Sequence, residues 1–239
     1  MSEWAPKRFW KTVDVTEVDQ GFSVTLDGRP VKTPAKRALT LPTRAMADMV
    51  AAEWDAQVEK VDPMTMPVMR GANAAIDKVA VQHAEVADML AAYGDSDLLS
   101  YRADSPAGLV ARQAEGWDPL LDWAEGRFGG RLKVFSGVMH EPQDPILLAA
   151  MAKSVHDMSD FELAGFHDLV SLSGSLIIGF AAAWDQSAPE ALWDLSRIDE
   201  DWQAEQWGVD EEAAEAAGIK RESFLNAKQF FDASRGENG

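Results

Sequence analysis

The sequence predicts an α+β fold, with a small N-terminal antiparallel β domain followed by a larger all-helical domain. Residues 11–18 and 22–26 alternate apolar and polar side chains, which is typical of half-buried strands. After Pro42 the apolar residues recur with the helical period, and capping residues separate the helical stretches. We therefore expect a β-rich domain over 1–42, a helical domain over 43–215, and an acidic, amphipathic C-terminal tail over 216–239.

The β domain is organised around the stretch 26–42, where a tight turn, strand alternation and positive charge coincide. Asp27 and Gly28 tolerate the positive φ of a hairpin turn. We expect a return arm over 29–33 and a further short strand over 38–41. A sheet this small needs a partner layer against one face to be stable. Three cations lie within six residues of this stretch, namely Lys32, Lys36 and Arg37, and Arg29 precedes them.

The remaining chain reads as a series of helices. Thr43 is a good N-cap for the first, and Ser159 with Glu162 matches the capping-box pattern at the start of the most apolar region. Residues 132–135 form either a short strand or an extended lead into the next helix. The low hydrophobicity of 210–218 suggests disorder there. The expected helices cover about 44–57, 68–78, 81–93, 106–127, 145–158, 163–184 (one helix or a pair) and 189–207.

Charge is unevenly distributed along a chain of net charge −18. Residues 1–44 carry eight Lys/Arg and five Asp/Glu, whereas 185–218 carry eleven Asp/Glu and a single Arg. An acidic chain is poorly suited to nucleic acid, because neutralising phosphates requires a basic face. Oppositely charged regions instead suit a protein that holds another protein. The alternative is that both regions are solvated surfaces that keep an acidic protein soluble.

Several other classes are disfavoured by the sequence. No apolar run reaches the length of about 20 residues that a membrane-spanning helix needs, so we expect no membrane insertion. The N-terminal residues do not resemble a secretory signal. The chain has no cysteine, which excludes disulfides and thiolate sites and fits a reducing cytoplasm.

No motif indicates catalysis or a cofactor. The four histidines never fall three or four residues apart, so we expect no metal site, and neither a phosphate-binding glycine loop nor a G-x-S-x-G sequence is present. We therefore expect no cofactor and no small-molecule substrate. The alternative is an enzyme that uses carboxylates and cations in a cleft between the β and helical domains, with these candidates: Asp27, Arg29, Lys32, Asp55 and Asp77.

Two of the nine tryptophans, Trp202 and Trp207, lie in a strongly acidic helix. Tryptophan is enriched at interface hot spots, yet an ordinary acidic surface over core tryptophans explains the same pattern. Helical phase places Asp201 and Glu205 on one side of this helix.

Five segments follow one another in a characteristic order: LDGRPVKTPAK (26–36), AAEWDAQ (51–57), VDP with MP (61–63 and 66–67), AAID (74–77) and DEDWQAEQWG (199–208). Taken together, they resemble one family, the assembly chaperones for the alpha subunit of the F-type ATP synthase catalytic head. The resemblance covers about 8–208. The family includes a mitochondrial assembly factor, so this chain would be a bacterial relative.

This resemblance implies a β-rich N-terminal domain, a helical C-terminal domain and no enzymatic activity. Its members bind the unassembled alpha subunit and shield the surface that will meet the beta subunit. An acidic residue in the C-terminal helix matters to that activity; Glu205 is its best match, and Glu200 and Glu211 are weaker matches. A general adaptor for another protein assembly remains open. The partner-binding residues that we expect are Glu205, Trp207, Trp202, Glu200, Glu211, Arg29 and Lys32.

Overall fold

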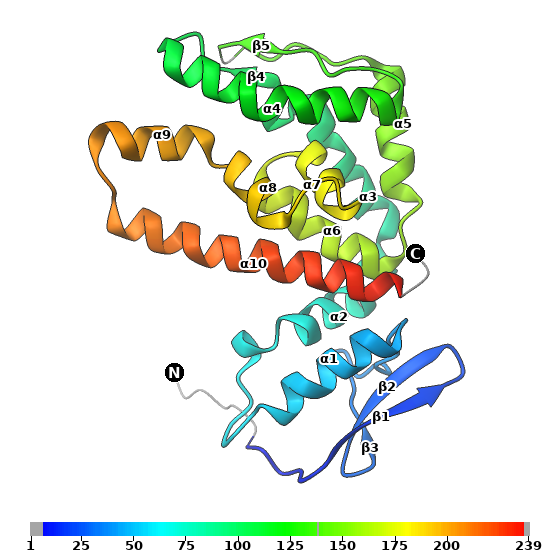
Figure 1. Cartoon of the computed structure of the whole chain (residues 1–239). Coiled ribbons are helices and arrows are strands. Elements are labelled where there is room, and N and C mark those ends of the chain that lie inside the picture. The colour runs from blue at the N-terminus through cyan, green and yellow to red at the C-terminus, as the bar shows by residue number, and fades with distance from the viewer. Residues whose placement is uncertain (1–6, 138, 237–239) are drawn as a thin grey trace. The chain divides into compact units, whose positions relative to one another are not determined.

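The computed structural model describes residues 7–137 and 139–236 and confirms the α+β class (Figure 1). No helix in this part of the chain combines the length and the apolar character needed to cross a membrane. The strands are β1 (Val13–Val18), β2 (Gly21–Leu26), β3 (Arg29–Pro30), β4 (Tyr101–Arg102) and β5 (Phe135–Ser136). The α-helices are α1 (Arg44–Asp55), α2 (Pro67–Asp77), α3 (His83–Ala91), α4 (Ala107–Phe128), α5 (Pro145–His156), α6 (Asp160–Ser173), α7 (Leu176–Ala183), α8 (Pro189–Leu195), α9 (Ile198–Trp207) and α10 (Glu211–Arg235).

The described chain divides into two compact units. Unit 1 contains residues 7–83, Ser159–Gly165 and 229–236, and unit 2 contains Ala84–Met158 and Phe166–Lys228. The domain boundaries after residues 42 and 215 stay a prediction, because they concern independent folding, which compactness alone does not test.

The sheet of unit 1 is an antiparallel meander in the order β1-β2-β3. Val15 of β1 pairs with Val24 of β2, and Leu26 pairs with Arg29 across the predicted turn. The turn residues Asp27 and Gly28 have φ values of 48° and 76°, as a tight hairpin requires. The return arm is shorter than expected.

The stretch 38–41, predicted as a strand, makes only isolated bridges, from Ala38 to Lys32 and from Leu41 to Phe22. Gly21 explains one of these contacts, because a Cβ there would lie 2.2 Å from the carbonyl oxygen of Leu41. The backbone can approach so closely only where no side chain is present.

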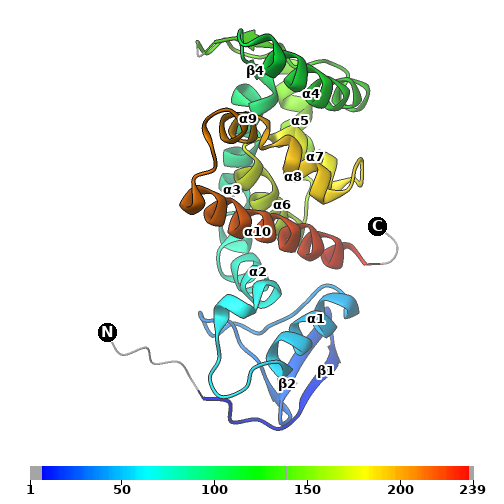
Figure 2. The ribbon, with the colours of Figure 1, turned by 60° about the vertical axis from the view of Figure 1, so that its left-hand side comes forward.

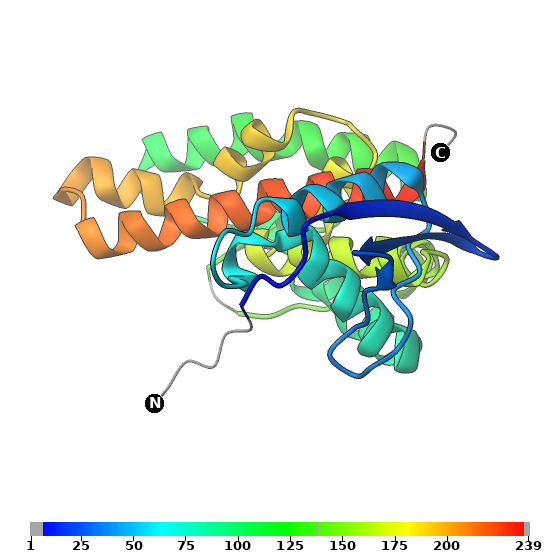
Figure 3. The same ribbon diagram turned by 90° about the horizontal axis from the view of Figure 1, so that it is seen from below.

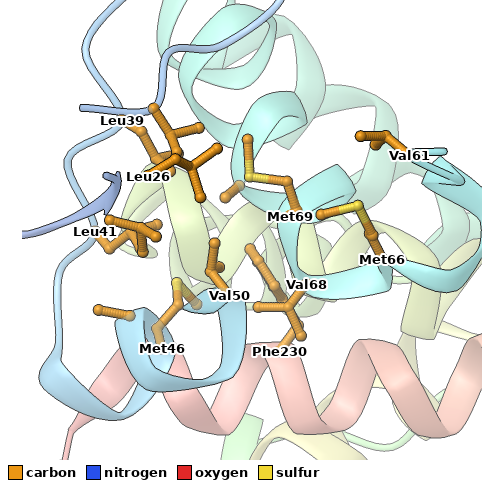
Figure 4. Close-up of a cluster of buried hydrophobic side chains, with 14 of the residues drawn as sticks. Leu26, Leu39, Leu41, Met46, Val50, Val61, Met66, Val68, Met69 and Phe230 are labelled. Carbon is orange, nitrogen blue, oxygen red and sulfur yellow. The ribbon is translucent and has the colours of Figure 1, made fainter. Parts of the chain in front are cut away.

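One apolar core joins this sheet to α1 and α2 (Figure 4). Methionines and branched side chains of the two helices pack on the inner face of β2 and on the segment after β3. Phe230, near the end of α10, completes the same core, and a Cβ on Gly71 of α2 would lie 2.6 Å from its ring. Residues 229–236, the last described part of the C-terminal tail, therefore belong to unit 1.

Side chains of α1 fix the loop that follows it. Both carboxylate oxygens of Glu53 accept backbone N–H bonds at the start of α2, from Val68 at 2.7 Å and Met69 at 2.8 Å. The buried Gln57 accepts the N–H of Asp62 at 2.7 Å. These contacts satisfy groups that a helix start leaves without intrahelical partners.

Asp77, at the end of α2, holds the segment after the hairpin in the same way. Its carboxylate accepts the hydroxyl of Thr33 at 2.7 Å and the N–H of Ala35 at 3.0 Å. Arg37 of the same segment donates to the carbonyl oxygen of Ile76 at 2.7 Å. Hydrogen bonds from side chains, most of them to backbone groups, thereby connect four segments of the chain: 26–36 with its neighbour Arg37, 51–57, 61–69 and 74–77.

Unit 2 is helical around α7, whose residues are all buried. The expected apolar helix over 163–184 is a pair, α6 and α7, separated by Gly174 with φ of 71°. The capping box at the start of α6 is confirmed, since Ser159 and Glu162 exchange side-chain-to-backbone hydrogen bonds. Residues 132–135 lead into β5, which pairs in parallel with β4.

Two expectations near the C-terminus differ from the structure. The helix expected over 189–207 is interrupted at Ser196, so α8 and α9 are separate helices. Residues 210–218, where disorder was expected, begin α10, with Asp210 accepting the N–H groups of Glu212 and Ala213. Low hydrophobicity was a poor guide here, because alanine favours helix strongly even where little is buried.

Asp97 is a fully buried carboxyl that organises the start of α7. It accepts the hydroxyl of Ser175 at 2.7 Å, the N–H of Ile177 at 3.1 Å and the N–H of Leu99 at 3.0 Å. Burial nevertheless raises the pKa of its carboxyl to about 6, because removing the charge from water outweighs these hydrogen bonds.

Replacing this carboxyl by Asp97→Asn should lower the free energy of unfolding by about 2–4 kcal/mol, because the amide NH₂ would face a buried backbone N–H. Urea unfolding measures this loss. The folded-state pKa lies above the ordinary value of about 3.9, so the stabilisation by Asp97 is complete below pH 4 and declines as the pH rises to about 6. The difference between wild type and variant should therefore be larger at pH 4 than at pH 7; a difference independent of pH would contradict this assignment.

Candidate partner-binding site

The acidic helix α9 and the end of α8 are held against α4 by three polar contacts within unit 2. Trp117 of α4 donates its Nε1–H to the carbonyl oxygen of Leu195, the last residue of α8, at 2.8 Å. One turn before Trp117 on α4, the buried Gln113 donates to Asp199 at 2.6 Å. Arg112, which directly precedes Gln113, binds Glu205. One face of α9 is thus occupied by α4.

Glu205, the acidic residue singled out from the sequence, forms a bidentate ion pair. Both guanidinium nitrogens of Arg112 donate to its carboxylate, at 2.7 and 2.8 Å. The guanidinium also lies over the ring of Trp202, 5.0 Å from its centroid. The hydrogen bonds from Arg112 hold the pKa of the Glu205 carboxyl below its usual value. Gly108 allows the close fit, since a Cβ there would lie 2.6 Å from the Trp202 ring.

The other side of α9 borders a groove of about 640 Å³. It lies between α9, the end of α8 and the first half of α10, three segments that belong to the same unit. Figures 2 and 3 show α9 and α10 joined by a short connection at one end of the helical region. Its lining is Trp193, Asp194, Arg197, Glu200, Asp201, Gln203, Ala204, Trp207, Gly208, Val209, Asp210, Ala213, Ala214, Ala217, Gly218 and Arg221.

Small residues and one exposed tryptophan make up the apolar part of this groove. The α10 wall consists largely of alanine and glycine, so a partner could come close to the helix backbone. The Trp207 side chain is 81% exposed, although tryptophan side chains are usually buried. Val209, in the connection, is 70% exposed. Such exposure of apolar side chains beside a groove is typical of a protein interaction site.

Acidic side chains predominate around the groove. Four carboxylates face two cations, and one of the cations, Arg197, is paired with Glu200 at 2.8 Å. Partial burial raises the pKa of the Asp201 carboxyl, and the neighbouring carboxylates of Asp194 and Glu205 add to this effect. A cation from a partner would relieve the repulsion between these acids.

The structure separates the seven residues that the sequence singled out. Glu200 and Trp207 line the groove, whereas Trp202 and Glu205 contact α4. Glu211 is exposed in the first turn of α10 and does not line the groove. The remaining two residues, Arg29 and Lys32, belong to unit 1 and line a different pocket.

The sequence reasoning missed the α10 wall and three of the groove carboxylates. Ala213, Ala214 and Ala217 fall at three- and four-residue spacing, which puts them on one helix face. That spacing was a usable signal for a close-packing surface. Asp194 and Asp210 carried no signal, because they reach the groove only through the fold.

The carboxylates proposed for a catalytic alternative have structural roles. Asp27 accepts the N–H groups of Lys11 and Thr12, both at 2.9 Å, and these bonds lower the pKa of its carboxyl. Asp55 pairs with Arg8 at 3.0 Å. Asp77 is bound to the hairpin segment. Each of the three carboxylates is thus engaged by the backbone, a hydroxyl or a cation of unit 1.

Comparisons with known proteins agree on one family. Residues 7–125 match the family described as ATP12 chaperone protein. The crystal structure of Atp12 from Paracoccus denitrificans is 46% identical, with a TM-score of 0.94 over 98% of this chain and 100% of that one. The crystal structure of a protein from Agrobacterium tumefaciens is 43% identical, with a TM-score of 0.91 over 95% of this chain and 86% of that one.

Mitochondrial Atp12 of Schizosaccharomyces pombe is 25% identical over 222 residues, covering 87% of this chain and 76% of the yeast protein. The family is described as a chaperone family, which agrees with the structural roles of the carboxylates above. The chain belongs to the ATP12 family of ATP synthase assembly chaperones and is not an enzyme.

Proposed function

We propose that this chaperone binds the unassembled alpha subunit of the F-type ATP synthase head in the bacterial cytoplasm. It shields the alpha-subunit surface that will meet the beta subunit and so supports assembly of the head. The observation that carries this proposal is the acidic groove between α9 and α10, with its exposed Trp207. A subunit surface that awaits its partner is an aggregation hazard, and a cover for it must bind apolar groups reversibly.

The chemistry of the groove suggests which part of the client it takes. The alanine wall accepts an apolar face at close range, and the surrounding carboxylates favour lysine or arginine beside it. We propose an amphipathic, basic segment of the alpha subunit as the occupant. Trp207 would be its main apolar anchor, and Asp194, Glu200, Asp201 and Asp210 would face its cations.

Glu205 supports this site in a different way. Its two carboxylate oxygens are engaged by Arg112, so its role is to hold α9 in position rather than to contact the client. Trp202 belongs to the same support, because it packs between Arg112 and Gly108. Glu211 adds negative charge beside the groove, at the N-terminal end of α10.

The first test is capture of the client. The immobilised chain should retain free alpha subunit, but neither free beta subunit nor the assembled head, because the alpha surface is covered in the head. Retention is measured on purified subunits. Capture of beta subunit alone, or of the intact head, would contradict the proposal, and so would the absence of any alpha-subunit binding at micromolar concentration.

Trp207→Ala should weaken alpha-subunit binding by roughly tenfold to a hundredfold, as loss of an anchoring tryptophan does at other interfaces. The side chain is mostly exposed, so the variant should unfold at the same temperature as wild type. Ile219→Ala is the matched control, since Ile219 is 61% exposed on α10 but does not line the groove. Titration calorimetry measures both; equal losses in the two variants would count against the groove.

Glu205→Lys should abolish alpha-subunit binding, because a lysine there faces Arg112 and drives α9 away from α4. The exchanged pair Arg112→Glu with Glu205→Arg restores the attraction between the helices. If Glu205 only positions α9, this exchange recovers most of the binding. A folded exchange variant that still fails to bind would show instead that Glu205 contacts the client.

A further inference from the structure

A second pocket, of about 240 Å³, lies in unit 1 beside the hairpin. It is separate from the groove and is built from the N-terminal segment, the two arms of the hairpin, the end of α1 and the loop after α1. We refer to it as the hairpin pocket. Its lining is Phe9, Trp10, Leu26, Arg29, Pro30, Val31, Lys32, Trp54 and Val61.

Aromatic rings form much of this pocket. Trp10 and Trp54 lie edge to face with ring centroids 5.2 Å apart. Phe9 makes the same kind of edge-to-face contact with Trp10, also at 5.2 Å. Phe9 is 66% exposed, which is unusual for a phenylalanine that has aromatic neighbours available. The pocket therefore offers an apolar partner a surface that the described chain leaves partly uncovered.

Both tryptophans also carry an unused donor. The Nε1–H groups of Trp10 and Trp54 are buried and have no hydrogen-bond acceptor among the described residues. Buried indole N–H groups usually find an acceptor, as Trp117 does in unit 2.

The charged residues of the pocket are both cations. Arg29 and Lys32 are exposed and make no ion pair with any described residue, and no acid belongs to the lining. The nearby Arg8 is different, because it is occupied by Asp55 and by the carbonyl oxygen of Gln57. Two unpaired cations beside apolar rings attract an anionic partner group.

We propose that the hairpin pocket binds a second segment of the client, in which a bulky apolar side chain stands next to a carboxylate. The apolar side chain would lie against the tryptophans and Phe9, and the carboxylate would face Arg29 and Lys32. A free phosphate would leave most of the apolar lining uncovered, so a peptide segment fits better. The assignment of this segment to the alpha subunit rests on the proposed function. The recognition of an apolar side chain beside a carboxylate rests on the pocket alone.

The pocket can be tested without the client. The ¹⁵N-labelled chain is titrated with the peptide acetyl-Gly-Phe-Glu-Gly-amide, and the indole N–H signals are followed by NMR. The signals of Trp10 and Trp54 should move, whereas those of Trp117 and Trp193 in unit 2 should not. The peptide with lysine in place of glutamate should have little effect. Unmoved signals at millimolar peptide, or equal shifts with both peptides, would overturn the inference.

A second experiment, with purified alpha subunit, tests whether the hairpin pocket contributes to client binding. Arg29→Glu with Lys32→Glu should abolish the peptide shifts and weaken alpha-subunit binding about tenfold. Lys36→Glu with Lys78→Glu makes the same change in charge at exposed sites outside the pocket, and should do neither. Peptide shifts without any binding of alpha subunit to wild type would refute the proposed function but keep the pocket. Alpha-subunit binding that the pocket variant retains in full would overturn the inference alone.

Discussion

The N-terminal unit depends on carboxylates that accept backbone N–H groups from distant segments. Glu53 binds the start of α2, and Asp77 at the end of α2 binds the segment after the hairpin. These segments contain prolines and turns, so their backbone groups have few partners of their own. The two carboxylates thereby fix the positions of the hairpin and of α1, and with them the hairpin pocket. This is a physical reason for the sequence motifs that first indicated the family.

At its acidic end, the helical unit leaves part of its surface uncovered instead of holding every segment in place. Three contacts hold α9 and the end of α8 on α4, yet the first half of α10 buries little and leaves a groove open beside Trp207. Leaving apolar surface exposed costs stability, and an interaction with a partner is a reason to keep it. A groove with acidic walls and few apolar anchors also suits the reversible binding that we propose.

The features that could be predicted from the sequence are those that depend on residues close together in the chain. The turn at Asp27 and Gly28, and the capping box of Ser159 with Glu162, depend on neighbours in sequence, and both were found in the structure. The helix over 210–218 was missed because hydrophobicity was weighed above helix propensity. The partner of Glu205 could not be read from the sequence, because Arg112 is 93 residues away and only tertiary packing brings the two together.

Hydrogen–deuterium exchange with and without purified alpha subunit tests the central claim most directly. Residues 200–221 of α9 and α10 are largely exposed, so their amides should exchange readily in the free chain. Bound alpha subunit should slow exchange there, most of all around Trp207 and the alanine wall. Unchanged exchange over this region in a complex that forms stably would place the client elsewhere and contradict the account.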